Sequence, residues 1–138
     1  MPQVLAYACD DATTRFHKTT IDLREPGPGE IYFDVKYAGI CHSDIHTARG
    51  EWGPVDYPLV PGHEFVGVVA AVGEGATRFA VGDRVGVGCM VGSCGQCEMC
   101  GAGYEQWCTG TPGTLWTYRA DADGNPTTGG YSQGFTVS

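Results

Sequence analysis

Four cysteines in one short segment have the types and spacing of a metal site. Two residues separate Cys94 from Cys97 and Cys97 from Cys100, and seven residues separate Cys100 from Cys108. Such a thiolate set suits tetrahedral zinc, and a site closed by four protein ligands leaves no position for a substrate. Glycines between the ligands permit the tight turns that wrap a backbone around an ion, which favours zinc over disulfides. The segment therefore predicts a structural zinc loop over residues 89–108, and any catalysis must take place elsewhere.

A second group of chemically active side chains lies upstream. Residues 41–46 read Cys-His-Ser-Asp-Ile-His, and a Gly-His-Glu turn follows at 62–64. A catalytic zinc uses three protein ligands and keeps a fourth position open for water or substrate. A lone cysteine after a strand is more often a small buried hydrophobic residue. The residues alone therefore leave this segment open between a metal site and core packing.

Five segments, in one order, resemble the medium-chain zinc-dependent alcohol dehydrogenases. They are GICHSDIH, YPLVPGHEFVGVVAAVG, VGDRVGVG, the four-cysteine loop and TTGGYSQGF. The nearest resemblance is to the cinnamyl-alcohol-dehydrogenase branch, through HSDIH, EWGPVDYPLVPGHE and LWTY. It covers nearly the whole chain and implies the GroES-like fold of that family's catalytic domain.

The resemblance implies a catalytic zinc with Cys41 and His63 as ligands. The family's third ligand is a further cysteine beyond the matched stretch, and neither Cys9 nor Cys89 is assigned to that role. Glu64 is expected to approach the metal when substrate is absent. The alternative is a buried carboxylate that needs a cationic partner.

The resemblance also assigns roles to the residues around these ligands. Asp44 is expected to accept a hydrogen bond from the non-ligating nitrogen of His63, or to cap a helix, and both can hold. Ser43 and His46 resemble the family's proton relay, which runs along the cofactor ribose; the alternatives are an N-cap at Ser43 and a solvated helix face at His46. His42 matches a position that in relatives meets the cofactor pyrophosphate.

Large side chains are the candidates for the wall of a substrate cleft. They are Trp52, Leu59 and Trp116, with Cys89 as a weaker candidate by its matching position. Aromatic side chains form apolar walls for aromatic substrates, although tryptophans in a small domain usually serve the core. Trp107 is expected to pack against the zinc loop beside Cys108.

Composition limits the classes of function. The chain has 138 residues, sized for one domain, with 16 acidic and 8 basic residues and a formal net charge of -8. This balance, without any basic run, argues against binding to nucleic acid or to an anionic membrane surface. The start lacks a cationic leader, and seven cysteines at mostly metal-binding spacings fit a reducing compartment. We therefore expect a soluble, cytoplasmic protein.

Short strands are expected to position these side chains. Strands are predicted at 4–9, 30–38, 65–72 and 83–87, the last two as buried strands, with a final strand from Tyr131 onward. A short helix is predicted from Ser43 to Arg49, ended by Gly50, and a polar surface loop at 120–130. With 22 glycines and hardly a helical period, the sequence predicts a mainly β protein, a small, partly open barrel.

A dinucleotide-binding motif is missing from the sequence. Two Gly-x-Gly pairs, at 73–75 and 86–88, begin one, but Arg78 and Val91 stand where its last glycine is required. Hydride transfer needs a dinucleotide. We therefore expect residues 1–138 to be an incomplete GroES-like catalytic domain, whose Rossmann domain belongs to a longer product.

Two hypotheses of function follow from different classes. The first is the catalytic-domain portion of a zinc-dependent alcohol dehydrogenase or aldehyde reductase, homo-oligomeric in full length, that transfers hydride between NADP or NAD and a primary, preferably aromatic, alcohol or aldehyde. A polyol dehydrogenase or another alcohol dehydrogenase branch is the runner-up. The second is a non-catalytic, zinc-stapled GroES-like module for interaction or assembly. The joint presence of Ser43, His46 and Glu64 favours the first.

Overall fold

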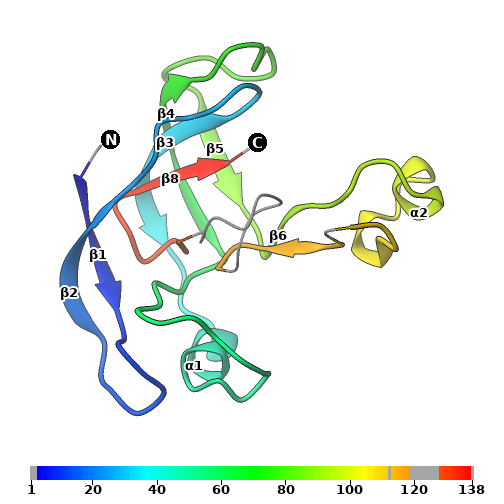
Figure 1. Ribbon diagram of the computed structural model, residues 1–138. Helices are drawn as coiled ribbons and strands as arrows, with labels where there is room; N and C mark the ends of the chain where they lie inside the picture. The colour runs from blue at the N-terminus through cyan, green and yellow to red at the C-terminus, as the bar shows by residue number, and fades with distance from the viewer. Residues whose placement is uncertain (1–2, 112, 119–127, 138) are drawn as a thin grey trace.

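The computed structural model describes residues 3–111, 113–118 and 128–137 (Figure 1). Within them the chain is mainly β, as predicted. The elements in order are β1 (Gln3–Ala8), β2 (His17–Asp22), β3 (Ile31–Ala38), α1 (His42–Ala48), β4 (Phe65–Val72), β5 (Arg84–Val87), β6 (Met90–Gly92), α2 (Glu98–Gly101), the 3-10 turn η1 (Glu105–Trp107), β7 (Leu115–Trp116) and β8 (Gly134–Val137). No helix of the described segments has the length and apolar character to span a membrane.

The main sheet has four antiparallel strands in the order β5-β4-β3-β8. Its covered face holds a core of Ile31, Phe33, Phe65, Val69 and Phe135, all buried. The three phenylalanine rings lie with centroids 4.8 to 5.9 Å apart. Burying one such side chain contributes about 1.5–3 kcal/mol, so this cluster anchors the sheet.

The prediction that residues 65–72 and 83–87 form buried strands was wrong for one face of the sheet. In β4 buried and exposed residues alternate over the first half, and Val66 keeps 48% of its surface exposed. In β5, a strand at the edge of the sheet, Arg84 and Gly86 are exposed. An antiparallel sheet needs only one covered face, and here apolar residues also occupy the other. β3 behaves likewise, because Ile31 and Phe33 are buried as its alternation predicts, whereas Tyr37 is 77% exposed.

A two-stranded antiparallel ribbon is formed by β1 and β2. β2 was not predicted, because its residues HKTTID are mostly polar and exposed. β1 reaches the rest of the chain through isolated bridges between Ala6 and Ser132 and between Cys9 and Leu59. The ribbon therefore supports both the stretch before Gly62 and the stretch that leads into β8.

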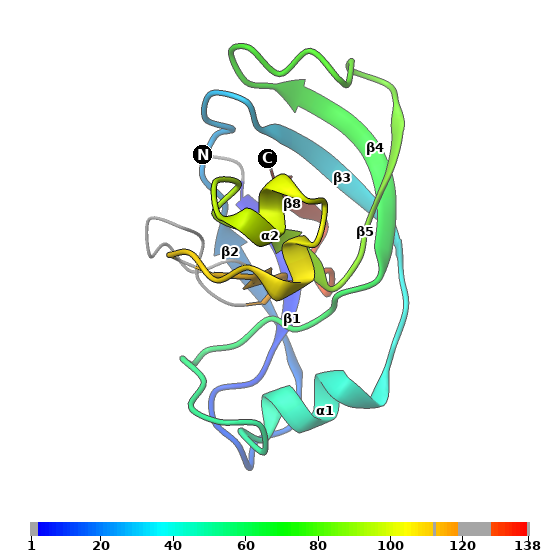
Figure 2. The same cartoon turned by 90° about the vertical axis from the view of Figure 1, so that its right-hand side faces the viewer.

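Two further features place the chemistry at different ends of the molecule. α1 lies beyond the end of β3 at the lower end of the views in Figures 1 and 2, within one residue of its predicted bounds at each end. The pair β6–β7, with α2 and η1, forms an arm that projects from the main sheet. We call residues 89–108 within it the zinc loop.

Candidate metal centres

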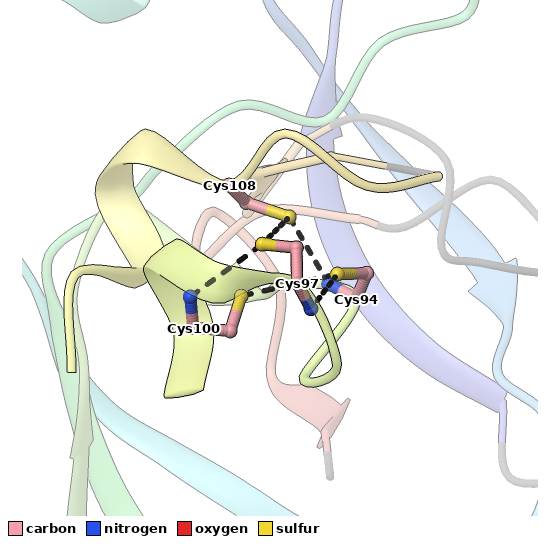
Figure 3. A group of neighbouring side chains, drawn as sticks. All are labelled: Cys94, Cys97, Cys100 and Cys108. Carbon is pink, nitrogen blue, oxygen red and sulfur yellow. Dashed lines mark hydrogen bonds between the residues drawn. The ribbon is translucent and has the colours of Figure 1, made fainter. Parts of the chain in front are cut away.

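Four of the five cysteines of the zinc loop, Cys94, Cys97, Cys100 and Cys108, turn their sulfur atoms toward one another (Figure 3). The Sγ atoms of Cys94 and Cys100 lie 3.9 Å apart, and those of Cys97 and Cys108 lie 4.0 Å apart. Ligands about 2.3 Å from a tetrahedral zinc would be about 3.8 Å from each other, whereas a disulfide needs about 2.05 Å. All seven cysteines are free. The residues present therefore fit a zinc ion and not a disulfide.

Backbone groups favour thiolates in this loop. The N–H of Cys100 lies 3.5 Å from the Cys97 sulfur and lowers the pKa of Cys97 to about 5. The N–H groups of Gln96 and Cys97 lower the pKa of Cys94. Cys100 differs: although Ser93 favours its thiolate, burial and the neighbouring sulfurs raise its pKa to about 11. Opposite pKa shifts are expected where several thiols lie side by side, because one thiolate disfavours ionisation of the next. A divalent cation would offset their negative charge.

Glycines give the loop its shape, partly as predicted. Gly95 and Gly103 have φ of +68° and +80°, which side chains rarely adopt. Gly110 was missed: a Cβ there would collide with the Cys94 sulfur, so the chain passes close to the site at that point. The packing role expected for Trp107 was wrong, because its side chain is 69% exposed.

The second candidate centre joins Cys41 to the Gly-His-Glu turn. Ligand atoms of Cys41, His63 and Glu64 all lie within 4.8 Å of one another. The His63 side chain is 13% exposed, whereas that of Glu64 is 50% exposed, so the alternative of a buried carboxylate was wrong. Gly39 makes room for Glu64, because a Cβ there would lie 2.7 Å from its carboxyl group. One sulfur, one nitrogen and one oxygen donor suit zinc.

The buried carboxylate of Asp44 contacts the histidine of this candidate centre. The carboxylate is 1% exposed, and its Oδ1 lies 3.0 Å from Nδ1 of His63. A carboxylate accepts hydrogen bonds, so this contact favours the tautomer with the proton on Nδ1, which leaves Nε2 for a metal. Asp44 also caps α1, because its Oδ2 accepts from the N–H of Cys41 at 3.0 Å. The N-cap is Cys41, so the alternative of an N-cap at Ser43 was wrong.

The residues predicted to relay protons lie along α1. Ser43 Oγ is 3.3 Å from Nε2 of His63. The His46 ring lies 4.6 Å from the ring of His42 and stacks on Trp52 at 5.1 Å. His46 Nδ1 contacts the Glu51 carboxylate, and this hydrogen bond lowers the pKa of Glu51. Sequence reasoning missed Glu51, whose signal was its place just after the helix-ending Gly50.

The proposed cleft wall is only partly assembled around these residues. Trp52 and Trp116 are 58% and 43% exposed, and Cys89 is exposed too. Leu59 is instead 4% exposed and packs in a core cluster with Cys9 and Ala48. Tyr118, which was not predicted, meets the His63 ring edge-on at 5.8 Å. Tyr118 therefore lies beside a candidate metal ligand, whereas Trp52 lies beside the relay candidate His46.

A cavity of about 400 Å³ with a mixed polar and apolar lining lies elsewhere, against the main sheet. Its lining includes Ile31, Phe33, Val85, Val87 and Val137. None of the predicted ligands or relay residues lines it. The candidate metal ligands and relay residues therefore lie outside this cavity.

The sequence profile of the family described as "Alcohol dehydrogenase GroES-like domain" matches residues 27–138. The chain belongs to this family, and the predicted GroES-like fold is confirmed. It is 56% identical over 138 residues to NADP-dependent alcohol dehydrogenase C 1 of Mycolicibacterium smegmatis, covering 99% of this chain and 39% of that protein. It is 52% identical over 137 residues to the probable formaldehyde dehydrogenase AdhA of Bacillus subtilis, with the same coverage.

Solved structures agree with the sequence relatives. A cinnamyl alcohol dehydrogenase from Sorghum bicolor superposes with a TM-score of 0.90 at 40% identity, covering 99% of this chain and 39% of that one. The Helicobacter pylori CAD complexed with NADP(H) gives 0.87 at 40% identity, covering 98% and 39%. The chain thus spans about two fifths of the length of the relatives it matches. These matches confirm the predicted resemblance to alcohol dehydrogenases of the cinnamyl type.

Proposed function

We propose that this chain is the catalytic-domain portion of a zinc-dependent, NADP-using alcohol dehydrogenase or aldehyde reductase. The observation that carries the proposal is the meeting of Cys41, His63 and Glu64 ligand atoms within 4.8 Å in a chain of the alcohol dehydrogenase family. A purely structural module has no use for this second, partly exposed donor set in addition to a closed four-cysteine site.

In this proposal Cys41 and His63 hold the catalytic zinc, and Asp44 keeps His63 in the tautomer that leaves Nε2 for the metal. A bound zinc supplies a Lewis acid, which polarises a carbonyl or eases deprotonation of an alcohol. Glu64, the most exposed of the three donors, would hold the open position of the metal when substrate is absent. The third permanent ligand is a cysteine outside residues 1–138.

Proton transfer is assigned to α1. Ser43, beside His63, would accept the proton of the substrate oxygen and give up its own along the cofactor ribose to His46, which would pass a proton to solvent with Glu51 as its partner. His42, next to His46, meets the cofactor pyrophosphate. Trp52, Trp116 and Tyr118 offer flat apolar surfaces for an aromatic primary alcohol or aldehyde. The full-length enzyme acts in the cytoplasm as a homo-oligomer on such small molecules.

A chimera tests this function. Residues 1–138 replace the matching segment of the Mycolicibacterium smegmatis relative, and reduction of cinnamaldehyde and butyraldehyde is followed with NADPH and NADH. The chimera should reduce cinnamaldehyde with NADPH. His63→Ala should abolish turnover by removing a zinc ligand, while His17→Ala, a change of an exposed histidine in β2, should leave it unchanged.

Two outcomes would overturn the proposal in different ways. A chimera that is folded and holds two zinc ions per chain but reduces neither aldehyde would favour the non-catalytic module. A chimera that acts on polyols with NAD would keep the enzyme class but reject the cinnamyl-type branch.

A further inference from the structure

The buried carboxylate of Asp44 has four hydrogen-bond donors, two for each oxygen. Oδ1 accepts from Nδ1 of His63 at 3.0 Å and from the N–H of Gly62 at 3.1 Å. Oδ2 accepts from the N–H of Cys41 at 3.0 Å and from the hydroxyl of Tyr131 at 3.1 Å. A carboxylate offers about four acceptor positions, so every one is used. Of the two side-chain donors, His63 belongs to the metal centre, and Tyr131 has no role in the chemistry described so far.

Tyr131 reaches Asp44 from a distant part of the chain that is held firmly in place. Its N–H donates to the carbonyl of Pro61 at 2.9 Å, and the N–H of Gly130 donates to that of Gly62 at 3.1 Å. Gly129 and Gly130, expected in a surface loop, are in fact buried; a Cβ on Gly130 would collide with Phe65. The rest of the predicted loop, residues 120–127, lies outside the described residues. The segment that carries Tyr131 therefore lies directly against the turn that carries His63.

The phenol ring is also fixed, so its hydroxyl has a defined direction. The ring packs against Ala6, Ala8 and Val60 and meets Phe16 edge-on at 6.2 Å. Burial, and then the nearby Asp44 carboxylate, raise the pKa of Tyr131. The hydroxyl consequently keeps its proton and donates a hydrogen bond to Oδ2 of Asp44.

Removing this donor would change more than one hydrogen bond. Oδ2 would keep only the N–H of Cys41, and a buried acceptor left unfilled is costly. The carboxylate would be free to turn about its terminal bond, which carries Oδ1 away from Nδ1 of His63. Partners of metal-binding histidines commonly change metal affinity by 10- to 100-fold when they are lost.

We propose that Tyr131 is a positioning residue of the candidate catalytic metal centre. Its hydroxyl holds Asp44 so that His63 keeps Nδ1 protonated and turns Nε2 toward Cys41 and Glu64. The inference rests on the proposed function only in taking this centre to be a metal site.

Cobalt(II) binding tests the inference on the chain itself. The zinc loop is first filled with zinc, and cobalt(II) is then titrated while its thiolate charge-transfer and d–d bands are recorded. Tyr131→Phe, which keeps the ring, should weaken cobalt binding about 10-fold and alter the d–d bands. Tyr57→Phe is the matched control, because that hydroxyl donates to the Ala48 carbonyl at 2.7 Å at the other end of α1; it should shift binding less than about twofold.

A double-mutant cycle separates positioning from general destabilisation. If Tyr131 acts through Asp44, adding Tyr131→Phe to Asp44→Asn should cause no further loss of cobalt affinity. Additive losses, or equal losses in Tyr131→Phe and Tyr57→Phe, would reduce Tyr131 to a structural residue.

A metal-free measurement decides the question even if the cobalt arm fails. Long-range 1H–15N spectra report which nitrogen of His63 carries the proton. The parent and Tyr57→Phe should show mainly the Nδ1–H form, whereas Tyr131→Phe should show more of the Nε2–H form. Identical spectra in all three proteins would overturn the inference. If the parent takes up no cobalt because its third permanent ligand is missing, these spectra alone decide the role of Tyr131.

Discussion

At the residue scale, the proton exit proposed at His46 rests on three contacts of its side chain. Its ring stacks on Trp52 and lies against His42, and its Nδ1 is hydrogen-bonded to Glu51. The side chain is 35% exposed, so solvent reaches it while the aromatic neighbours hold its ring. A histidine in such a place can pass protons between the protein and solvent without contacting the reacting atoms.

His46→Gln tests this exit in the chimera. We expect turnover to fall about 10- to 100-fold, because only the final proton transfer is interrupted while the metal ligands remain. Turnover and its recovery with small buffer acids such as imidazole are the measurements. His17→Ala, which changes the exposed histidine of β2, provides the control. An unchanged rate in His46→Gln would remove this residue from the relay.

At the element scale, the arm that carries the zinc loop has little core of its own. Of the four clustered cysteines only Cys100 is buried. The aromatic residues Tyr104 and Trp107 are 54% and 69% exposed. Its helical parts are short, four residues in α2 and three in η1. Isolated helices of this length are not stable in water, so we expect metal ligation to supply most of the order of the arm.

Cys97→Ser should therefore destabilise the arm. We expect the melting temperature to fall by about 5 °C or more and the variant to lose zinc to a mild chelator. Cys89→Ser, which changes an exposed free cysteine outside the four-sulfur cluster, is the matched control. Equal melting curves for Cys97→Ser and the parent would contradict a stapling role for the loop.

Acidification should release this zinc within a defined range of pH. Because the pKa of Cys97 is lowered from 9.0 to about 5 in the folded loop, its thiolate contributes fully above pH 9. That contribution shrinks as the pH falls toward 5 and is absent below it. We expect a metallochromic indicator to report zinc retention at pH 7 and loss near pH 5. Zinc retained well below pH 4 would contradict the assignment.

Features set by residues close together in the sequence were predicted, whereas features that depend on contacts between distant residues were missed. The zinc loop and α1 were predicted because their signals, cysteine spacing and a helix-ending glycine, are local. β2 was missed because pairing with β1, not apolar alternation, makes it a strand. The contact of Tyr131 with Asp44 joins residues 87 positions apart, and no local pattern announces such a meeting.

At the scale of the whole molecule, the two centres should differ in affinity. The zinc loop offers four thiolates, whereas the second centre offers one thiolate, one imidazole and a half-exposed carboxylate. We expect elemental analysis after dialysis against a mild chelator to give close to one zinc per chain. Retention of two ions would mean that residues within this chain complete the second centre. The chain alone should also show no reductase activity, since it contains no dinucleotide-binding glycine motif.

The hydrogen bond from Tyr131 to Asp44 also has a consequence during synthesis, because its two residues are made at different times. During synthesis at about 5–20 residues per second, 87 residues separate the appearance of Asp44 from that of its last donor, a delay of about 4 to 17 seconds. All four cysteines of the zinc loop leave the ribosome within that interval. A nascent chain can thus capture its structural ion before the second centre has acquired its full set of supports, so the order of metal loading is built into the order of translation.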